Sequence, residues 1–268
     1  MKKTFTPKLS PRLEGIVSLL PECEKVADIG CDHGYISISL VQRGIAKSAV
    51  ACDIKAGPLE FAKKNIAKSG LEKLIDVRLS PGLNKLSEGE ADAIVIAGMG
   101  MRTIAGIILD DLSKAKAADY ILIQAQSEIP EMRRFFEENG FTLLRNMLMI
   151  EEDKYYFAML LTSKKEVEEE YLKSLGGGPK RLKERLTETG PGPEFSEFAE
   201  SLDELFGLDL IIEDTDMKKY LGHVIGEWSE SIEKISGAKK PDFEKMDELK
   251  KKLAMAELAL ELNTLFKK

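Results

Sequence analysis

The sequence lacks the residues that mark several protein classes. Its three cysteines and two histidines among 268 residues show no zinc spacing, no metal-ligand cluster and no disulfide framework. Apolar runs such as 93–97 are far shorter than the roughly 20 residues that span a bilayer. No apolar stretch follows the basic residues at the N-terminus, as a secretory signal would require. We therefore expect a cytoplasmic protein with reduced thiols, no metal and no membrane partner.

The sequence also lacks the basic excess that nucleic-acid-binding proteins usually carry. Residues 1–164 contain 22 basic and 22 acidic side chains, whereas residues 165–268 contain 17 and 24 and so hold the whole net charge of −7. Any nucleic-acid partner must therefore be bound by local patches. Hydrophobic residues at 43% and charged residues at 32% are ordinary for a folded protein.

Strand-like and helical segments alternate as far as residue 162. Strands are predicted at 26–29, 49–53, 75–79, 93–97 and 120–124, and helices at 9–20, 35–43, 58–69, 103–109 and 129–139. The last two segments, 141–150 and 155–161, are predicted to form a hairpin. This order is typical of a Rossmann-like α/β fold, with a parallel sheet covered on both faces and antiparallel strands at one edge.

The composition changes after residue 163, where only helices are predicted, at 164–175, 195–205, 217–235 and 243–266. The last helix has apolar residues at Met246, Leu249, Leu253, Ala256 and Leu260, a 3-4-3-4 spacing. That spacing suits an antiparallel helical hairpin or coiled coil, and an ordinary amphipathic helix equally well. We predict two domains, 1–163 and 164–268.

Residues 28–34, Asp-Ile-Gly-Cys-Asp-His-Gly, follow the first predicted strand. Glycines there allow a ligand to approach the backbone closely, at the sheet edge where α/β proteins bind ligands. Asp53 ends the second strand 23 residues after Gly30, which suits hydrogen bonds to a ribose diol. The sequence therefore predicts a nucleoside-containing ligand.

The glycine spacing favours one such ligand over another. A dinucleotide site needs G-x-G-x-x-G, whereas this turn has only Gly30 and Gly34, and Asp32 would repel a pyrophosphate. S-adenosylmethionine is cationic at its sulfonium and amino groups, so Asp28 and Asp32 would attract it. We predict an S-adenosylmethionine site. A dinucleotide site and a turn that binds nothing are the weaker alternatives.

Two further loops complete the predicted site. The turn 80–83, Ser-Pro-Gly-Leu, is placed to meet an adenine ring. Residues 98–102, Gly-Met-Gly-Met-Arg, leave room for a flat base and lack the Asn-Pro-Pro-aromatic pattern of enzymes that methylate exocyclic amines. His33 fits the role of orienting its turn better than that of a general base.

Three segments together resemble one known family. Residues 9–13 (Leu-Ser-Pro-Arg-Leu), 27–35 (Ala-Asp-Ile-Gly-Cys-Asp-His-Gly-Tyr) and 97–100 (Ala-Gly-Met-Gly) are similar to the bacterial tRNA (adenine-22-N1)-methyltransferase family, often called TrmK. The resemblance extends over about 1–162. It departs at Met101, where the family usually has glycine, and at 124–126, which read Gln-Ala-Gln instead of Gln-Pro-Asn.

This resemblance implies methyl transfer from S-adenosylmethionine to N1 of an adenine in the D-arm region of tRNA. The implied cofactor site consists of Arg12, Asp28, Gly30, Asp32, His33, Gly34, Asp53, Ile54, Gly82, Leu83, Gly98 and Met99. Asp32 is the candidate catalytic residue, because a carboxylate could stabilise the cationic product or accept its amine proton.

The expected substrate contacts are Gly100, Met101 and Arg102, together with Lys250, Lys251 and Lys252 on the last helix. The basic residues of 180–185 are further candidates for phosphate contacts, and both basic groups could equally be solvated faces. The partner is expected to be tRNA, and the protein a monomer or weak dimer. Because the fold fixes the donor and not the acceptor, two alternatives stay open: a methyltransferase for a small molecule or protein, and a cofactor-binding scaffold without catalysis.

Overall fold

The computed structural model describes residues 4–174 and 193–266. The chain forms two compact units, Met1–Leu175 and Gly176–Lys268. The first unit extends twelve residues beyond the predicted boundary at residue 163. The cause is α7 (Lys165–Ser174), which packs against the edge hairpin of the first unit and buries part of Tyr171 against its core.

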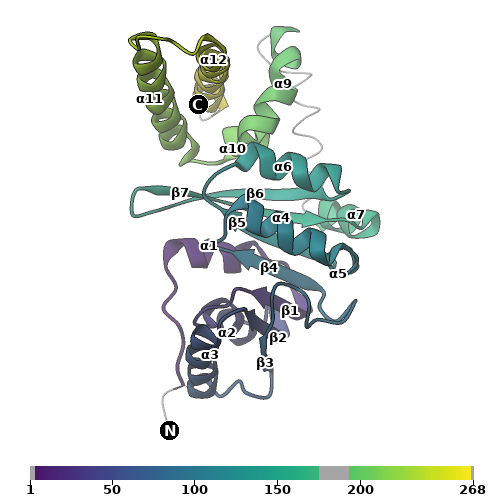
Figure 1. Cartoon of the computed structure of the whole chain (residues 1–268). Helices are drawn as coiled ribbons and strands as arrows, with labels where there is room; N and C mark the ends of the chain where they lie inside the picture. The colour runs from purple at the N-terminus through teal and green to yellow at the C-terminus, as the bar shows by residue number, and fades with distance from the viewer. Residues whose placement is uncertain (1–3, 175–192, 267–268) are drawn as a thin grey trace. The chain divides into compact units, whose positions relative to one another are not determined.

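The first unit is a seven-stranded sheet flanked by helices (Figure 1). Its strands are β1 (Cys23–Ile29), β2 (Ala46–Asp53), β3 (Ile75–Leu79), β4 (Ala93–Ala97), β5 (Tyr120–Ala125), β6 (Thr142–Glu151) and β7 (Lys154–Thr162). Its helices before α7 are α1 (Pro11–Leu19), α2 (Tyr35–Gln42), α3 (Ala56–Ser69), α4 (Met101–Asp110), α5 (Leu112–Ala117) and α6 (Ile129–Glu138).

The strand order is β3-β2-β1-β4-β5-β7-β6. Strands β1 to β5 pair in parallel, β7 is antiparallel to β5, and β6 is antiparallel to β7. The predicted α/β fold with an edge hairpin is confirmed. The strand order reverses between β1 and β4, and in open α/β sheets this is the point where ligands bind, beyond the carboxyl ends of the strands.

Both faces of this sheet are buried, which explains why its central strands are almost continuously apolar. Alternate residues of neighbouring strands form one core with α1, α2 and α3; the members include Val26, Ala49, Ala93, Val95, Leu122, Ile16, Ile38 and Ile66. The intervening residues, such as Ile94 and Ile96, are buried as well. Helices α4 and α6 pack on each other and bury Ile104 and Phe136.

The second unit is helical in its described part. It contains α9 (Pro193–Phe206), α10 (Leu208–Glu213), α11 (Met217–Ser236) and α12 (Phe243–Phe266). Helices α11 and α12 lie side by side as a hairpin, and Ala256 of the predicted apolar seam is fully buried (Figure 1). Asn263 ties α12 to the end of α10, because its Nδ2 donates to the Ile211 carbonyl at 2.6 Å.

Two helices within the described residues are not among those predicted from the sequence. Both α5 and α10 have six residues, too few to show a 3.6-residue period. Within residues 4–174 and 193–266, none of the helices combines the length and the apolar character needed to cross a membrane.

Candidate cofactor and substrate site

The site is organised around the turn that follows β1. The backbone N–H groups of Gly30 and Cys31 both donate to the Cys52 carbonyl, at 2.8 and 2.9 Å, so the turn is held against the end of β2. Gly30 has φ +77, and a Cβ there would collide with the Met99 side chain. The position therefore favours glycine for its backbone conformation, whereas the flexible end of Met99 could move aside.

Asp28 is buried beneath this turn with 2% of its surface exposed. Its Oδ2 accepts hydrogen bonds from the Ser37 hydroxyl at 2.6 Å and the Ser37 N–H at 3.2 Å. The N-cap of α2 is Gly34, which has no side chain, so the Asp28 carboxylate satisfies an N-terminal N–H in its place. Burial nevertheless raises the Asp28 pKa to about 6, because desolvation outweighs the hydrogen bonds that lower it.

Two neighbouring cavities open at the carboxyl ends of the strands, and Gly30 and Asp32 line both of them. The larger has a volume of about 450 Å³. It brings together seven of the predicted cofactor residues: Gly30, Asp32, Asp53, Ile54, Gly82, Leu83 and Met99. The smaller, about 260 Å³, is lined by six of them: Arg12, Asp28, Gly30, Asp32, His33 and Gly98.

The remaining predicted residues lie elsewhere. Gly34 lines neither of these two cavities; a Cβ there would be 3.2 Å from the Ala62 Cβ, so this glycine lets α2 pack closely on α3. Gly100 is the N-cap of α4, and Met101 and Arg102 begin that helix, also outside the lining of both cavities.

The predicted phosphate contacts of the second unit are two groups of basic residues, of which the structure describes only the one on α12. Lys250 pairs with Asp247 at 4.0 Å and Lys252 with Glu248 at 2.7 Å, so two of the three predicted lysines already face an acidic side chain of their own helix. The basic stretch Lys180, Arg181, Lys183 and Arg185 lies outside the described residues.

Asp53 ends β2 at the wall of the larger cavity. Its Oδ1 accepts from the Lys55 N–H at 2.8 Å, and its Oδ2 accepts from the Asp32 N–H at 3.4 Å. A carboxylate can accept about four hydrogen bonds, so both oxygens retain capacity for a ligand. Two adjacent hydroxyls would find an acceptor oxygen each on this carboxylate.

Gln124, at the end of β5, was noted in the sequence only as part of the 124–126 departure. It is 1% exposed, and its Oε1 accepts from Arg12 Nη1 at 2.8 Å and from the Gly98 N–H at 3.1 Å. Two donors converging on one atom identify that atom as the amide oxygen. Arg12 also donates to Glu151 at 3.2 Å, so its guanidinium is held at the smaller cavity from two sides.

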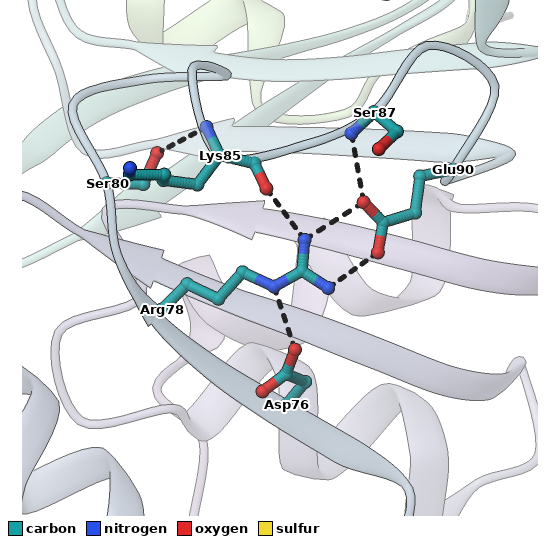
Figure 2. Close-up of polar contacts among 6 residues, drawn as sticks. All are labelled: Asp76, Arg78, Ser80, Lys85, Ser87 and Glu90. Carbon is teal, nitrogen blue, oxygen red and sulfur yellow. Dashed lines mark hydrogen bonds and ion pairs between the residues drawn. The ribbon is translucent and has the colours of Figure 1, made fainter.

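The wall of the larger cavity beyond β3 is braced by one arginine (Figure 2). Arg78 donates to both oxygens of Glu90, at 2.9 and 2.6 Å, and also to Asp76 and to the Lys85 carbonyl. Ser80 Oγ accepts from the Lys85 N–H at 3.1 Å inside the same loop. The ion pair lowers the Glu90 pKa to about 2 and raises the Arg78 pKa.

Several lining residues were not predicted. Lys55 and Pro58 directly follow the second strand and could have been found from that position. Thr103, Ile107 and Asp110 lie four and three residues apart on α4, so they share the helix face that forms one side of the larger cavity. That spacing was visible in the sequence, but the direction of the face depends on tertiary packing.

Two cysteines flank the site as free thiols. Cys31 lines the smaller cavity and Cys52 is fully buried at the end of β2. Burial raises the Cys52 pKa to about 12 and the Cys31 pKa well above its usual value, with neighbouring carboxylates adding to the effect at Cys31. In the described part of the chain, no group of three or more histidine, cysteine or acidic side chains could hold a metal ion.

Comparison with known proteins agrees with this architecture. The family model described as "Methyltransferase domain" matches residues 9–159, more than half of the chain. The chain therefore belongs to this family of methyltransferases. Within it, the predicted resemblance to TrmK is confirmed by the sequence and structure matches that follow.

The tRNA (adenine(22)-N(1))-methyltransferase of Bacillus subtilis (strain 168) is 35% identical over 145 residues, 54% of this chain and 61% of that protein. The sequence match thus spans about three fifths of the curated relative. The crystal structure of B. subtilis TrmK has a TM-score of 0.74 at 26% identity and covers 94% of this chain and 99% of that one. The M. capricolum TrmK complex with S-adenosyl-homocysteine has a TM-score of 0.72 at 25% identity, covering 95% and 98%.

The first prediction concerns the brace at Arg78. Replacing Glu90 with Gln should lower the free energy of unfolding by about 1–2 kcal/mol, because the bidentate, charge-assisted pair is lost. Amide hydrogen exchange in 80–90 should become faster. The control is Glu88→Gln, an exposed position in the same loop.

Because the Glu90 pKa is lowered, the difference in stability between Glu90→Gln and the wild type should shrink as the pH falls from about 4.5 towards 2. Equal exchange in both variants would contradict the brace.

The second prediction concerns Asp28. Its raised pKa means that the protonated form favours folding; this stability is present below about pH 4 and is lost as the pH rises through 6. Relative to Asp28→Asn, the wild type should therefore lose up to about 3 kcal/mol of stability between pH 4 and pH 7.5. Urea unfolding at both pH values measures this difference. Parallel pH dependence of the two proteins would show that the Asp28 pKa is ordinary.

Proposed function

We propose that this protein uses S-adenosylmethionine to methylate N1 of an adenine in tRNA, at position 22 of the D-arm region. The observation that carries the proposal is the pair of cavities at the β1/β4 reversal, with the Asp53 carboxylate at one end and Arg12 and Asp28 at the other. The relatives named as tRNA (adenine-22-N1) methyltransferases, one of them in complex with S-adenosyl-homocysteine, support the substrate and the cofactor.

The residues present match the chemistry of this cofactor. An adenosine half needs apolar walls and an acceptor for the ribose hydroxyls, and the larger cavity offers Ile54, Leu83 and the Asp53 carboxylate. A methionine half carries an ammonium and a carboxylate, and the smaller cavity offers the acidic Asp28 and Asp32 together with the guanidinium of Arg12. We assign the two halves accordingly.

The cofactor supplies a methyl group on a positively charged sulfur. Adenine N1 already carries a lone pair, so the protein has to align that atom with the methyl carbon and exclude water. Because N1 lies on the Watson–Crick edge, a paired or stacked adenine must first be exposed. In our proposal Gly98 and Met99 border the flat ring, and the Asp32 carboxylate, which lines both cavities, stabilises the cationic product or accepts its amine proton.

The remaining parts of the proposal concern the contacts with the tRNA body, the cellular location and the oligomeric state. Gly100, Met101 and Arg102 at the start of α4 would contact the substrate, as would Lys251 of α12, whose neighbours on either side are paired with acids. Since tRNA is cytoplasmic and the three cysteines are free thiols, we propose that the protein acts in the cytoplasm, as a monomer or weak dimer.

The test is incubation with radiolabelled S-adenosylmethionine and unmodified total tRNA, followed by nucleoside analysis. We expect label in 1-methyladenosine, and loss of that label on a transcript in which adenine 22 is replaced by guanine. Label in a protein or small-molecule fraction instead would support the alternative acceptors. Cofactor binding by calorimetry without label in any fraction would support a scaffold without catalysis.

A further prediction tests the cofactor site directly. In Asp53→Asn the amide oxygen can still accept from the Lys55 N–H, but one of the two carboxylate oxygens is replaced by a donor. We expect the Kd for S-adenosylmethionine to rise about 10- to 100-fold, with the affinity for tRNA unchanged. Calorimetry and filter binding measure the two constants. An unchanged cofactor Kd would remove Asp53 from the site.

A further inference from the structure

One side of α3 leads away from the smaller cavity across the surface of the first unit. Phe61, Lys64 and Lys68 are spaced three and four residues apart and so share one face of this helix, which we call the α3 surface. All three side chains are exposed, and none was singled out in the sequence analysis. The three residues cover about 10 Å along the helix axis.

A cluster of three aromatic rings connects the α3 surface with the cavity; Phe61 is tilted by 58° against His33. The Phe61 ring, 54% exposed, lies with its centroid 5.3 Å from the His33 ring. His33 in turn stacks on Tyr35, with centroids 5.4 Å apart and an interplanar angle of 23°. His33 and Tyr35 both line the smaller cavity. Phe61 is the exposed member of this cluster, so its ring is accessible to a further flat group.

The charge of the α3 surface is positive, in a protein whose net charge is −7. Residues 54–74 contain five lysines and two glutamates. Lys63 is paired with Glu60 at 3.0 Å, but no described carboxylate forms an ion pair with Lys64 or Lys68. The Lys64 ammonium instead lies 5.8 Å from the centre of the Phe61 ring. These cations are therefore available to an anionic partner.

We propose that the α3 surface binds the single-stranded RNA segment next to the target adenine, with a base stacked on Phe61 and phosphates at Lys64 and Lys68. The inference rests on the proposed function. Stacking on aromatic rings combined with lysine contacts to the backbone is the usual chemistry of single-strand recognition. Extracting an adenine from its stack also leaves neighbouring bases without a stacking partner, and an exposed ring beside the site can supply one.

Charge favours RNA over a second copy of this chain as the occupant. A two-fold symmetric contact centred on Phe61 would bring Lys64 and Lys68 of one copy towards the same lysines of the other, and like charges repel. A phosphodiester backbone carries a negative charge on every nucleotide, so neighbouring phosphates can contact both lysines. The basic residues beside an exposed ring therefore point to a polyanion that also carries flat bases.

The test uses the full chain and four variants. Lys64→Glu/Lys68→Glu reverses the charge of the α3 surface, and Phe61→Ala removes the ring, whereas Phe61→Trp keeps a stacking surface. The matched control is Lys165→Glu/Lys173→Glu, the same charge change at two exposed lysines of α7, which packs on the hairpin at the opposite edge of the sheet from β3. The Kd for unmodified tRNA is measured by filter binding at several salt concentrations, and the Kd for S-adenosylmethionine by calorimetry.

We expect the lysine pair variant to raise the tRNA Kd at least about tenfold and to reduce the slope of log K against log salt by about 1.5. Phe61→Ala should raise the Kd about tenfold and Phe61→Trp should restore it. The cofactor Kd should stay within about twofold of wild type in all variants. The control pair should retain most of the tRNA affinity.

Tight tRNA binding by both the lysine pair variant and Phe61→Ala would overturn the proposal. So would a wild-type dimer that Phe61→Ala converts to a monomer without changing tRNA affinity, because the surface would then belong to a second copy. The measurement of the tRNA Kd does not depend on methylation. If the wild type binds tRNA through this surface but places no methyl group on it, the proposed function fails and the surface assignment stands.

Discussion

The reversal of the chain at the end of β1 is the constraint on which the rest of the site depends. The Cys52 carbonyl accepts hydrogen bonds from two consecutive N–H groups of this turn. The buried Asp28 carboxylate accepts hydrogen bonds from Ser37 in the first turn of α2 and so caps that helix. These bonds fix the direction of α2 and bring the turn against the end of β2. Asp32 and Asp53, which are 21 residues apart in the chain, are thereby held next to each other.

The other boundaries of the cleft are held by polar groups that act on the loops, in addition to buried side chains such as Leu83 and Leu86. Arg78 closes the loop after β3 through Glu90, and Gln124 holds both Arg12 and the Gly98 backbone after β4. The sheet supplies a rigid base, and a few charge-assisted hydrogen bonds set the distances between the walls. Such bonds are directional, so they position a cavity more narrowly than hydrophobic contacts do.

Strand ends were predictable because their signals are local. Gly30 and Asp53 were recognised from strand, turn and spacing, and both line the larger cavity. The brace at Arg78 was not, because nothing in the sequence states that an arginine in a strand will reach a glutamate twelve residues later. The packing of α7 on the hairpin was not predictable for a related reason: its sequence is that of a charged helix, and which side contacts β6 and β7 depends on tertiary packing. The acidic partners of Lys250 and Lys252 lie three and four residues away on α12, a spacing that the sequence already contains.

The buried thiols carry a consequence for the chemistry nearby. A methyl sulfonium is an alkylating agent, and the nucleophile that it would attack most readily in a protein is a thiolate. Cys31 lines the smaller cavity, yet burial and the surrounding carboxylates keep it, like Cys52 behind it, protonated at neutral pH. Burial, with a smaller contribution from the carboxylates that suit a cationic donor, therefore keeps the thiol at this cavity a weak nucleophile.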